Sequence, residues 1–383
     1  MRIGIIGAGH AGVEAAATAA ASGAQVTLFS AEPVLPYFRP RLIALAFGQV
    51  AGEAVRLHPA QWYLDKGITL RLDSRVTAFD ADRCSLTIGT EEHSFEGIVL
   101  TTGAEPILPC FASGAPDHVM PLWTAENADR IRSLIKPGGT IGIVGGGAIG
   151  VEAALRATSA GIKAVIIERA GGLIAGRLMP AAADVLMKQL VEKGIRILLK
   201  TAVMQTAALP GGRALITLDS GEAVEADLVI LCVGSKNDLG MAQRAGLKTS
   251  AGVIVDSRLQ TSAPHVFACG DIAEVGGIMC STAAEAVIQG RIAGANLCAV
   301  LSGGSGDMLN HKHKSESVSI KLGDLEMHLA GRPQGSGLEV KVLEGSNERA
   351  CRLLVMKDGR TVGVQMVGTN LDFRKFADTL VTQ

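Results

Sequence analysis

Six glycines at two matching spacings carry the strongest chemical signal in the 383-residue sequence. Each set follows a short apolar stretch, opens an alanine-rich stretch and fits the pattern G-x-G-x-x-G: Gly7, Gly9 and Gly12, then Gly145, Gly147 and Gly150. Such a turn suits a pyrophosphate, because one glycine permits the tight turn, one lets the backbone approach the anion and one packs helix on strand. The helix N-terminus then directs its unpaired N–H groups at the phosphates. Two such turns in one chain predict two bound dinucleotides.

The elements that position these glycines follow from the hydrophobic pattern. Strand Arg2–Ile6, helix Ala11–Ser22 and strand Gln25–Phe29 form one predicted βαβ unit, and Thr140–Glu168 forms the second. Further predictions are an amphipathic helix at Ala181–Lys193 and strands at Val76–Phe79, Ser85–Ile88, Ile98–Thr101, Ile195–Leu199, Ala214–Leu218 and Leu228–Cys232. Residues 302–316, rich in Gly, Ser, His and Lys, predict a linker. Residues 317–383 predict a strand-rich segment that ends in a helix.

Composition and charge fit a chain of the α/β class. The length suggests two or three domains, and 47 glycines, 48% hydrophobic residues and 3% aromatic residues suit an enzyme with many strand-to-helix turns. The formal net charge of -1 gives no general electrostatic reason to expect nucleic acid or a membrane surface as partner. No apolar run approaches the length of about 18 residues that a membrane span requires. We therefore expect neither nucleic-acid binding nor a membrane span.

The seven cysteines are scattered and include no C-x-x-C pair. Neither a disulfide framework nor a zinc site is indicated by this pattern. Arg2 and the Ala-rich stretch after it could be read as a secretory signal, but the glycine spacing and Glu14 favour the start of the mature fold. We expect a cytoplasmic protein.

Two further segments complete a resemblance to a known family. Residues 101–106 read Thr-Thr-Gly-Ala-Glu-Pro, which is similar to an A-T-G-x-x-P turn between domains. Residues 261–271 read Thr-Ser-Ala-Pro-His-Val-Phe-Ala-Cys-Gly-Asp, which is similar to the flavin signature T-x-x-x-x-V-F-A-x-G-D. With both glycine turns, residues 1–300 resemble the FAD- and NAD(P)-dependent pyridine nucleotide-disulfide oxidoreductases. The branch they resemble most contains NADH:rubredoxin reductases and nitrite reductase flavin domains, whereas residues 317–383 show only a general similarity to it.

The resemblance implies a glutathione reductase-like, three-layer α/β fold with two Rossmann-like dinucleotide-binding domains. The FAD domain would be discontinuous, formed by residues 1–108 and 240–305. The NAD domain would be inserted between these parts as residues 109–239. Residues 317–383 would form a small α+β C-terminal domain.

The flavin signature implies a role for Asp271, whose carboxylate would accept a hydrogen bond from a ribitol hydroxyl of FAD. The helix expected over 281–301 would point at the flavin pyrimidine, with Thr282 and Glu285 at capping-box spacing, so that its dipole favours the anionic reduced flavin. The alternatives are an Asp that only caps a turn and an ordinary capped helix. Four more residues are assigned to cofactor binding: Thr102, Gly103, Gly234 and Gly270.

Acidic residues after the second strand of each βαβ unit would bind the adenosine riboses. In the second copy this residue is Glu168, which would repel a 2'-phosphate and favours NADH over NADPH, although the adjacent Arg169 could accept that phosphate. In the first copy the acid is Glu32, within a segment 32–40 that reads Glu-Pro-Val-Leu-Pro-Tyr-Phe-Arg-Pro and is typical of rubredoxin and ferredoxin reductases. Arg39 would then lie near the FAD adenine or pyrophosphate.

One position departs from the family pattern. Many members place a lysine where this chain has Ala44, beside the flavin and paired with the glutamate that corresponds to Glu152. We assign Glu152 as the candidate catalytic residue. Either another cation pairs with it, or it contacts the nicotinamide alone.

Redox-active thiols and metal ligands are not expected. Residues 33–83, where the family places its redox cysteines, contain none. Cys269 and Cys280 lie near the flavin signature, but free cysteines are commonly small buried apolar residues. His10 occupies a variable position of the first glycine turn, where the backbone N–H matters whatever the side chain. His311 and His313 are expected to be solvated residues of the linker, so no metal is predicted.

These inferences together predict an FAD-dependent oxidoreductase that passes hydride from NADH to FAD and electrons on to a small carrier protein such as rubredoxin, or to a partner subunit. An acidic carrier would meet basic residues, for which Lys312, Lys314, Lys321 and Arg332 are available, unless these only solvate a linker. The alternatives are an NADH oxidase or reductase component of a larger complex, and a redox sensor that binds FAD and NADH without turnover. A homodimer is possible.

Overall fold

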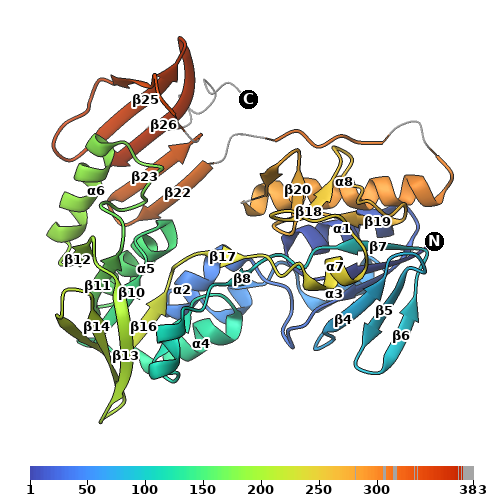
Figure 1. The fold of residues 1–383 in the computed structure, drawn as a ribbon, viewed down its shortest axis with the longest axis horizontal. Coiled ribbons are helices and arrows are strands. Elements are labelled where there is room, and N and C mark those ends of the chain that lie inside the picture. Colours follow the sequence, from blue (N-terminus) through green and yellow to red (C-terminus); the bar gives the residue numbers. More distant parts are fainter. Residues whose placement is uncertain are drawn as a thin grey trace. The chain divides into compact units, whose positions relative to one another are not determined.

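The computed structural model describes residues 1–280, 282–304, 308–313, 317–331, 333, 335–369, 371 and 373, except for the side chain of Leu322. Chain contacts divide these residues into two compact units (Figure 1). The first unit comprises residues 1–39, 52–105 and 235–314, and the second comprises residues 40–51, 106–234 and 315–383. Two short strands, β8 (Glu105–Pro106) and β17 (Ser235–Lys236), pair with each other. The boundaries of the FAD, NAD and C-terminal domains stay a prediction.

The first unit is built on a five-stranded parallel sheet in the order β19-β7-β1-β2-β3. Its strands are β1 (Arg2–Ile6), β2 (Gln25–Phe29), β3 (Ile68–Arg71), β7 (Gly97–Leu100) and β19 (Val266–Ala268). Helices α1 (His10–Ala21) and α8 (Ala283–Leu301) pack against each other and against these strands. The sheet and both helices share one apolar core, because their inward residues are mainly Ala, Ile, Leu, Val and Phe.

Smaller elements complete the first unit. They are two three-stranded sheets, β4 (Val76–Asp80), β5 (Ser85–Ile88) and β6 (Glu91–Ser94), and β18 (Val253–Val255), β20 (Ala273–Val275) and β21 (Ile278–Met279), with helices α3 (Ala60–Asp65) and α7 (Gly240–Arg244). The 3-10 turn Gly52–Val55 also belongs to this unit, whereas the 3-10 turn Arg39–Arg41 starts at the last residue of the segment 1–39.

The second unit repeats the parallel sheet, in the order β12-β11-β10-β16-β9. Its strands are β9 (Val119–Pro121), β10 (Thr140–Val144), β11 (Lys163–Glu168), β12 (Arg196–Leu199) and β16 (Leu228–Leu231). The repeat extends to register, because Ile3 of β1 pairs with Val26 and Gly97, and Ile141 of β10 pairs with Ala164 and Leu228. The other elements are α2 (Leu42–Ala46), α4 (Ala125–Leu134), α5 (Ala148–Ser159), α6 (Pro180–Glu192), the 3-10 turn Cys110–Gly114 and the antiparallel sheet of β13 (Val203–Leu209), β14 (Arg213–Leu218) and β15 (Ala223–Ala226).

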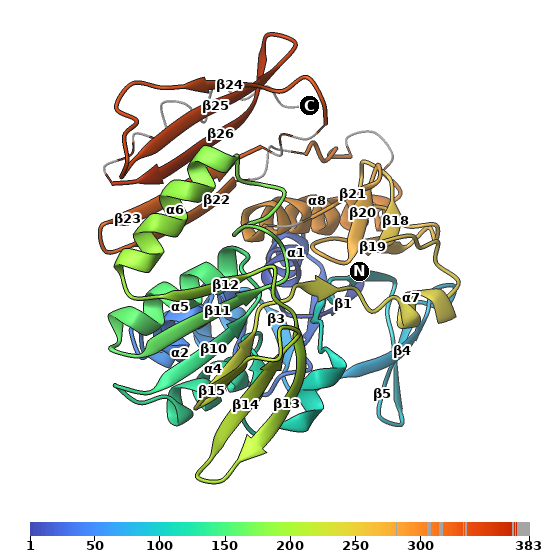
Figure 2. The same ribbon diagram turned by 60° about the vertical axis from the view of Figure 1, so that its left-hand side comes forward.

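The C-terminal segment forms an antiparallel sheet that belongs to the second unit. Its order is β22-β23-β26-β25-β24, from β22 (Ser317–Leu322), β23 (Leu325–Ala330), β24 (Glu339–Val342), β25 (Cys351–Lys357) and β26 (Arg360–Gly368). Helix α6 lies beside this sheet in both ribbon views and packs on β25 and β26 (Figures 1 and 2). The final helix predicted from the sequence falls mostly outside the described residues.

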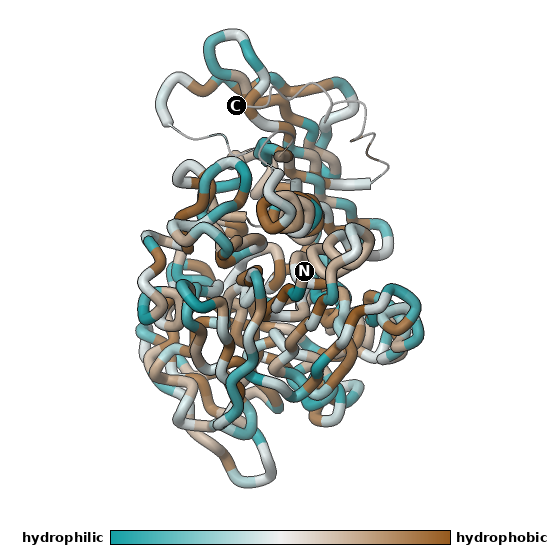
Figure 3. The backbone as a smooth tube through the Cα atoms, turned by 90° about the vertical axis from the view of Figure 1, so that its right-hand side faces the viewer, coloured by the Kyte–Doolittle hydropathy of each residue, from teal (hydrophilic) through white to brown (hydrophobic). Residues whose placement is uncertain are grey.

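The predicted α/β class and both βαβ units are confirmed, and the bounds of the predicted helices differ from the observed ones by at most two residues. Along the backbone, apolar residues mark the inner strands and helices, and hydrophilic residues mark outer loops (Figure 3). The described helices include none that is long and apolar enough to cross a membrane.

Both glycine turns are sterically constrained in the same way. Gly7 and Gly145 have φ of +107° and +110°, which favours glycine. A Cβ on Gly12 would lie 1.9 Å from the carbonyl oxygen of Gly7, and one on Gly150 would lie 2.0 Å from that of Gly145. The third glycine therefore lets the helix start directly against the end of the strand.

We expect Gly150→Ala to destabilise the second unit by about 1–3 kcal/mol, because the new methyl group meets backbone that cannot rotate away. Gly147→Ala is the matched control, since a Cβ there meets nothing within 4 Å. Denaturant unfolding without nucleotide measures both variants, and equal stabilities would contradict the steric argument.

Candidate dinucleotide sites

The first glycine turn joins β1 to α1 and is held by neighbouring strands. The N–H of Gly7 donates to the carbonyl of Phe29 at 2.9 Å, and Thr101 Oγ1 donates to the carbonyl of Gly7 at 2.6 Å. Thr101 thus holds the turn, a role that the sequence did not reveal, and the assignment of Thr102 and Gly103 to cofactor binding stays a prediction. Thr102 is exposed, and Gly103 has a positive φ of +69° in the following loop.

This turn has the open face that a pyrophosphate needs. A Cβ on Gly9 would meet nothing within 4 Å, so the backbone presents its N–H groups without steric cover. His10 begins α1 and contacts the ring of Phe38 edge-on at 5.0 Å. Burial, together with the charge of Arg39, lowers the pKa of His10 to about 4, so its ring is neutral. Its Nε2 is buried without a hydrogen-bond partner among the described residues, as expected for an atom that a bound cofactor would meet. These features fit FAD.

Glu32 and Arg39 lie on the same loop after β2. The hydroxyl of Tyr37 donates to both carboxylate oxygens of Glu32, at 2.9 and 2.8 Å. The Arg39 guanidinium lies over the ring of Tyr37, 5.8 Å from its centroid. Tyr37 thus fixes the acid that was predicted to bind a ribose, a role that the sequence alone did not reveal.

Asp271 follows β19 in the same unit, at the turn that Gly270 makes with φ of +78°. The N–H of Gly270 donates to Oε1 of the buried Gln289 on α8 at 2.8 Å. Burial raises the pKa of Asp271, and the Arg39 charge opposes that shift. Arg39 and Asp271 therefore act on each other electrostatically within the first unit, as expected if both bind one cofactor.

Helix α8 begins at the predicted place, with Thr282 as its N-cap. Thr282 Oγ1 accepts from the N–H of Glu285 at 3.2 Å. The Glu285 carboxylate is directed to His311 and His313, at 3.1 and 2.8 Å. Burial would raise the pKa of Glu285, but the hydrogen bonds to both histidines outweigh it and hold that pKa below its usual value.

The prediction of solvated histidines is therefore wrong, because the side chains of His311 and His313 are 1% and 21% exposed. Residues 308–313, within the predicted linker, belong to the first unit. Asn296 of α8 holds this segment, because its side chain donates to the carbonyl of Leu309 at 2.9 Å and accepts from that residue's N–H at 2.8 Å.

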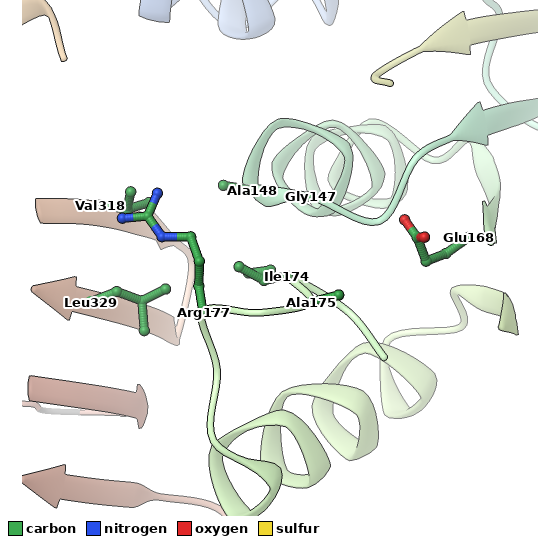
Figure 4. A pocket seen from close by; sticks show the side chains of 8 residues that line it. All are labelled: Gly147, Ala148, Glu168, Ile174, Ala175, Arg177, Val318 and Leu329. Atoms are coloured by element: carbon green, nitrogen blue, oxygen red, sulfur yellow. The ribbon is translucent and has the colours of Figure 1, made fainter. Parts of the chain in front are cut away.

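The second glycine turn repeats the open geometry beside Glu168. Glu168 accepts from the backbone N–H groups of Gly146 at 2.6 Å and of Ala170 at 2.5 Å, which fixes the carboxylate at the end of β11. Glu168 lines a cavity of about 270 Å³ together with Gly147, Ala148, Ile174, Ala175, Arg177, Val318 and Leu329 (Figure 4). Arg169 is exposed and does not line this cavity. The nearby guanidinium in the cavity is that of Arg177, which sequence reasoning missed.

The cavity wall is held by a residue of the C-terminal sheet. Gln365 of β26 is 1% exposed, its Oε1 accepts from the N–H of Met179 at 2.7 Å, and its Nε2 donates to the carbonyl of Arg177 at 2.6 Å. One buried amide thus satisfies two backbone groups of the loop between β11 and α6. Nothing in the local sequence marks Gln365, since the two partners lie almost two hundred residues away.

Glu152 has a cation as partner, the first of the two possibilities that the sequence left open. Oε1 of Glu152 lies 2.7 Å from Nη2 of Arg156, one turn further along α5. Arg156 also donates to the side chain of Gln49, which follows α2. Ala44 is buried within α2, and α2 packs on α4 and α5. The spacing of Glu152 and Arg156 could have revealed this pair.

The remaining predicted residues and thiols are placed as follows. Gly234 is an exposed glycine with φ of +96°, and its carbonyl accepts from the N–H of Ile107 at 3.1 Å. All seven cysteines are free thiols. Burial raises the pKa of Cys269 and Cys280, and raises that of Cys232 to about 12, so none of these three is a ready thiolate.

The structure describes two of the four basic residues that were predicted to dock an acidic carrier protein. Lys312 is exposed, and Lys321 pairs with Oε1 of Glu326 at 2.6 Å. Lys314 and Arg332 lie outside the described residues.

Residues 1–290 match the family model described as pyridine nucleotide-disulphide oxidoreductase. The chain belongs to this family. The predicted family membership is thereby confirmed, and the family supports FAD and NADH as the cofactors of an oxidoreductase.

Three named proteins, two relatives and one solved structure, are similar to this chain over most of its length. Rubredoxin-NAD(+) reductase of Pseudomonas putida is 30% identical over 308 residues, which cover 78% of this chain and 80% of that protein. Nitric oxide reductase FlRd-NAD(+) reductase of Escherichia coli is 28% identical over 318 residues, covering 83% and 82%. The solved ferredoxin reductase for the CYP199A2 system from Rhodopseudomonas palustris has a TM-score of 0.87 at 26% identity, covering 100% of this chain and 96% of that one.

We expect Gln365→Met to destabilise the second unit by about 1–3 kcal/mol for each backbone group left unsatisfied, because the thioether keeps the volume but not the hydrogen bonds. The control is Gln205→Met on β13, where the side chain is exposed. The stability of both variants is measured by thermal unfolding without nucleotide. Their KM for NADH is then determined by steady-state kinetics. A stability loss no larger than that of the control would show that Gln365 only fills space.

Proposed function

We propose that this chain is an NADH-dependent FAD oxidoreductase that passes electrons to a small carrier protein. The observation that carries this proposal is the pair of matching glycine turns, each open at its second glycine and each at the end of a parallel strand. One chain with two dinucleotide sites suits a reaction between two dinucleotides. Its relatives are named as a rubredoxin-NAD(+) reductase and an FlRd-NAD(+) reductase, and these names support a carrier protein as the acceptor.

The first unit would hold FAD. The α1 N-terminus would bind the pyrophosphate, Glu32 a ribose, Arg39 the adenine or pyrophosphate side, and Asp271 a ribitol hydroxyl. When bound, FAD would supply the hydride- and electron-transfer chemistry. Thr102, Gly103, Gly234, Gly270 and Thr282 remain assigned to cofactor binding. The domain boundaries 1–108 with 240–305 for FAD, 109–239 for NAD and 317–383 for the C-terminal domain are part of this proposal.

The second unit would hold NADH at the α5 N-terminus, with Glu168 on the adenosine ribose. Its carboxylate keeps further lone pairs for ribose hydroxyls while it accepts from Gly146 and Ala170. Glu152, held by Arg156, would contact the nicotinamide side.

Transfer would not use a cysteine. Residues 33–83 contain none, and burial raises the pKa of Cys269 and Cys280. Electrons would therefore leave from the flavin directly to a one-electron carrier. Seven free thiols also suit the reducing environment of the cytoplasm, which we propose as the location.

We expect Glu168→Gln to narrow the kcat/KM preference for NADH over NADPH about tenfold, because removing the charge removes about 1.4 kcal/mol of repulsion toward a 2'-phosphate. Arg169→Ala is the control, since this neighbour lies outside the cavity. If Arg169→Ala shifts the preference and Glu168→Gln does not, the exposed guanidinium rather than the carboxylate selects the nucleotide.

The function itself is tested by NADH-driven reduction of rubredoxin, ferredoxin, a quinone and oxygen at two salt concentrations. We expect a carrier protein to be reduced fastest. Its rate should fall with salt, because the Debye length shrinks from about 10 Å at 0.1 M to about 3 Å at 1 M. Fastest reduction of oxygen or quinone without a salt effect would favour an NADH oxidase instead.

A further inference from the structure

A compact group of metal-ligand side chains lies in the first unit, at the start of α8. It comprises Glu285 in the first turn of α8 and His311 and His313 in the segment 308–313. The ligand atoms are Oε1 of Glu285, Nε2 of His311 and Nδ1 of His313, all within 4.8 Å of one another. We propose that these three residues bind a divalent transition-metal ion of the Zn²⁺ class.

The hydrogen-bond partners of His313 favour a proton or a metal ion between its Nδ1 and Glu285. Nε2 of His313 lies 3.1 Å from the carbonyl oxygen of Val275, which can only accept, so Nε2 carries the hydrogen. The Nδ1 lone pair of the neutral ring then faces Oε1 of Glu285 at 2.8 Å, and a carboxylate oxygen is also an acceptor. Two acceptors at this distance repel each other unless a proton or a metal ion lies between them.

A metal ion suits this arrangement. A histidine ligand usually donates its other N–H to a carbonyl or carboxylate, as His313 does to Val275. Two imidazole nitrogens and one carboxylate oxygen are a common donor set for Zn²⁺, with bonds of about 2.0–2.2 Å. Oε1 lies within hydrogen-bond distance of both nitrogens, so small side-chain rotations would bring all three atoms to one ion. The His313 side chain is 21% exposed, so an ion would reach it from solvent.

The segment that supplies both histidines is held before any ion binds. The N–H of His311 donates to the carbonyl of Ser257 at 2.7 Å, and Ser257 Oγ donates to Asn310 Oδ1 at 2.8 Å. Asn296 adds its two bonds to Leu309. Nε2 of Gln289 lies 3.3 Å from Nε2 of His311, and this contact would be exchanged for the bond to the ion. Since α8 and this segment are fixed by these bonds, the binding energy need not be spent on ordering the ligands.

The ion would fasten the segment after α8 to the first turn of that helix. Because Thr282 caps the same turn, the site would also stabilise the helix start. This role does not depend on the acceptor or on turnover.

The test uses tag-free, FAD-loaded protein dialysed against Zn²⁺, and separately against Co²⁺. The unmodified chain should retain one equivalent of Zn²⁺ and give the visible absorption of low-symmetry Co²⁺. Glu285→Gln, His311→Ala and His313→Ala should each weaken Zn²⁺ binding at least tenfold. Lys312→Ala is the matched control, because this exposed residue lies between the two histidines and should leave binding unchanged.

Flavin absorbance and thermal unfolding of each variant distinguish the loss of a metal ligand from the loss of the folded structure. Zn²⁺ should raise Tm in the unmodified chain and in Lys312→Ala only. If His311→Ala fails to fold, His313→Ala decides, because its side chain is partly exposed. Equal Zn²⁺ binding by all variants, or none by the unmodified chain, would overturn the proposal and leave a buried imidazolium–carboxylate pair as the explanation of the cluster.

Discussion

The close approach of a helix to the end of a strand is the constraint on which both candidate sites depend. At each turn the third glycine brings helix backbone so near the first glycine that even one methyl group would collide with a carbonyl oxygen. The gain is that the helix N-terminus, with its unpaired N–H groups, lies directly at the end of the parallel sheet. The same geometry in both units shows that the duplication preserves a steric arrangement and not only a sequence pattern.

Around these turns, acidic side chains are held by specific donors. Tyr37 holds Glu32, backbone N–H groups hold Glu168, and Arg156 holds Glu152. A carboxylate fixed in this way loses little conformational freedom when it accepts a hydroxyl of a ligand, so its binding cost is lower. Arg156 on α5 also gives Glu152 a cation as partner, although this chain has Ala44 where related chains have a lysine.

The C-terminal sheet contributes to the second unit more than its weak sequence signal suggested. Gln365 satisfies two backbone groups of the loop that lines the Glu168 cavity, and Val318 and Leu329 line that cavity directly. Lys188 of α6 and Lys193, the residue after that helix, add ion pairs to Glu348 and Asp324, at 2.8 and 2.5 Å. These exposed pairs contribute little, whereas the buried amide of Gln365 leaves two unsatisfied groups if it is lost.

The sequence by itself determined the two βαβ units, the glycine turns, the place where α8 begins and the family, because each depends on local spacing and periodicity. Only the tertiary structure decided which partners the functional side chains have. Thr101, Gln365 and the pair His311 and His313 reach atoms far away along the chain, and no local pattern encodes such contacts. The sequence of a polar segment such as 308–313 is typical of a linker. In the structure, buried donors and acceptors on α8 satisfy hydrogen-bonding groups of this segment and hold it in place.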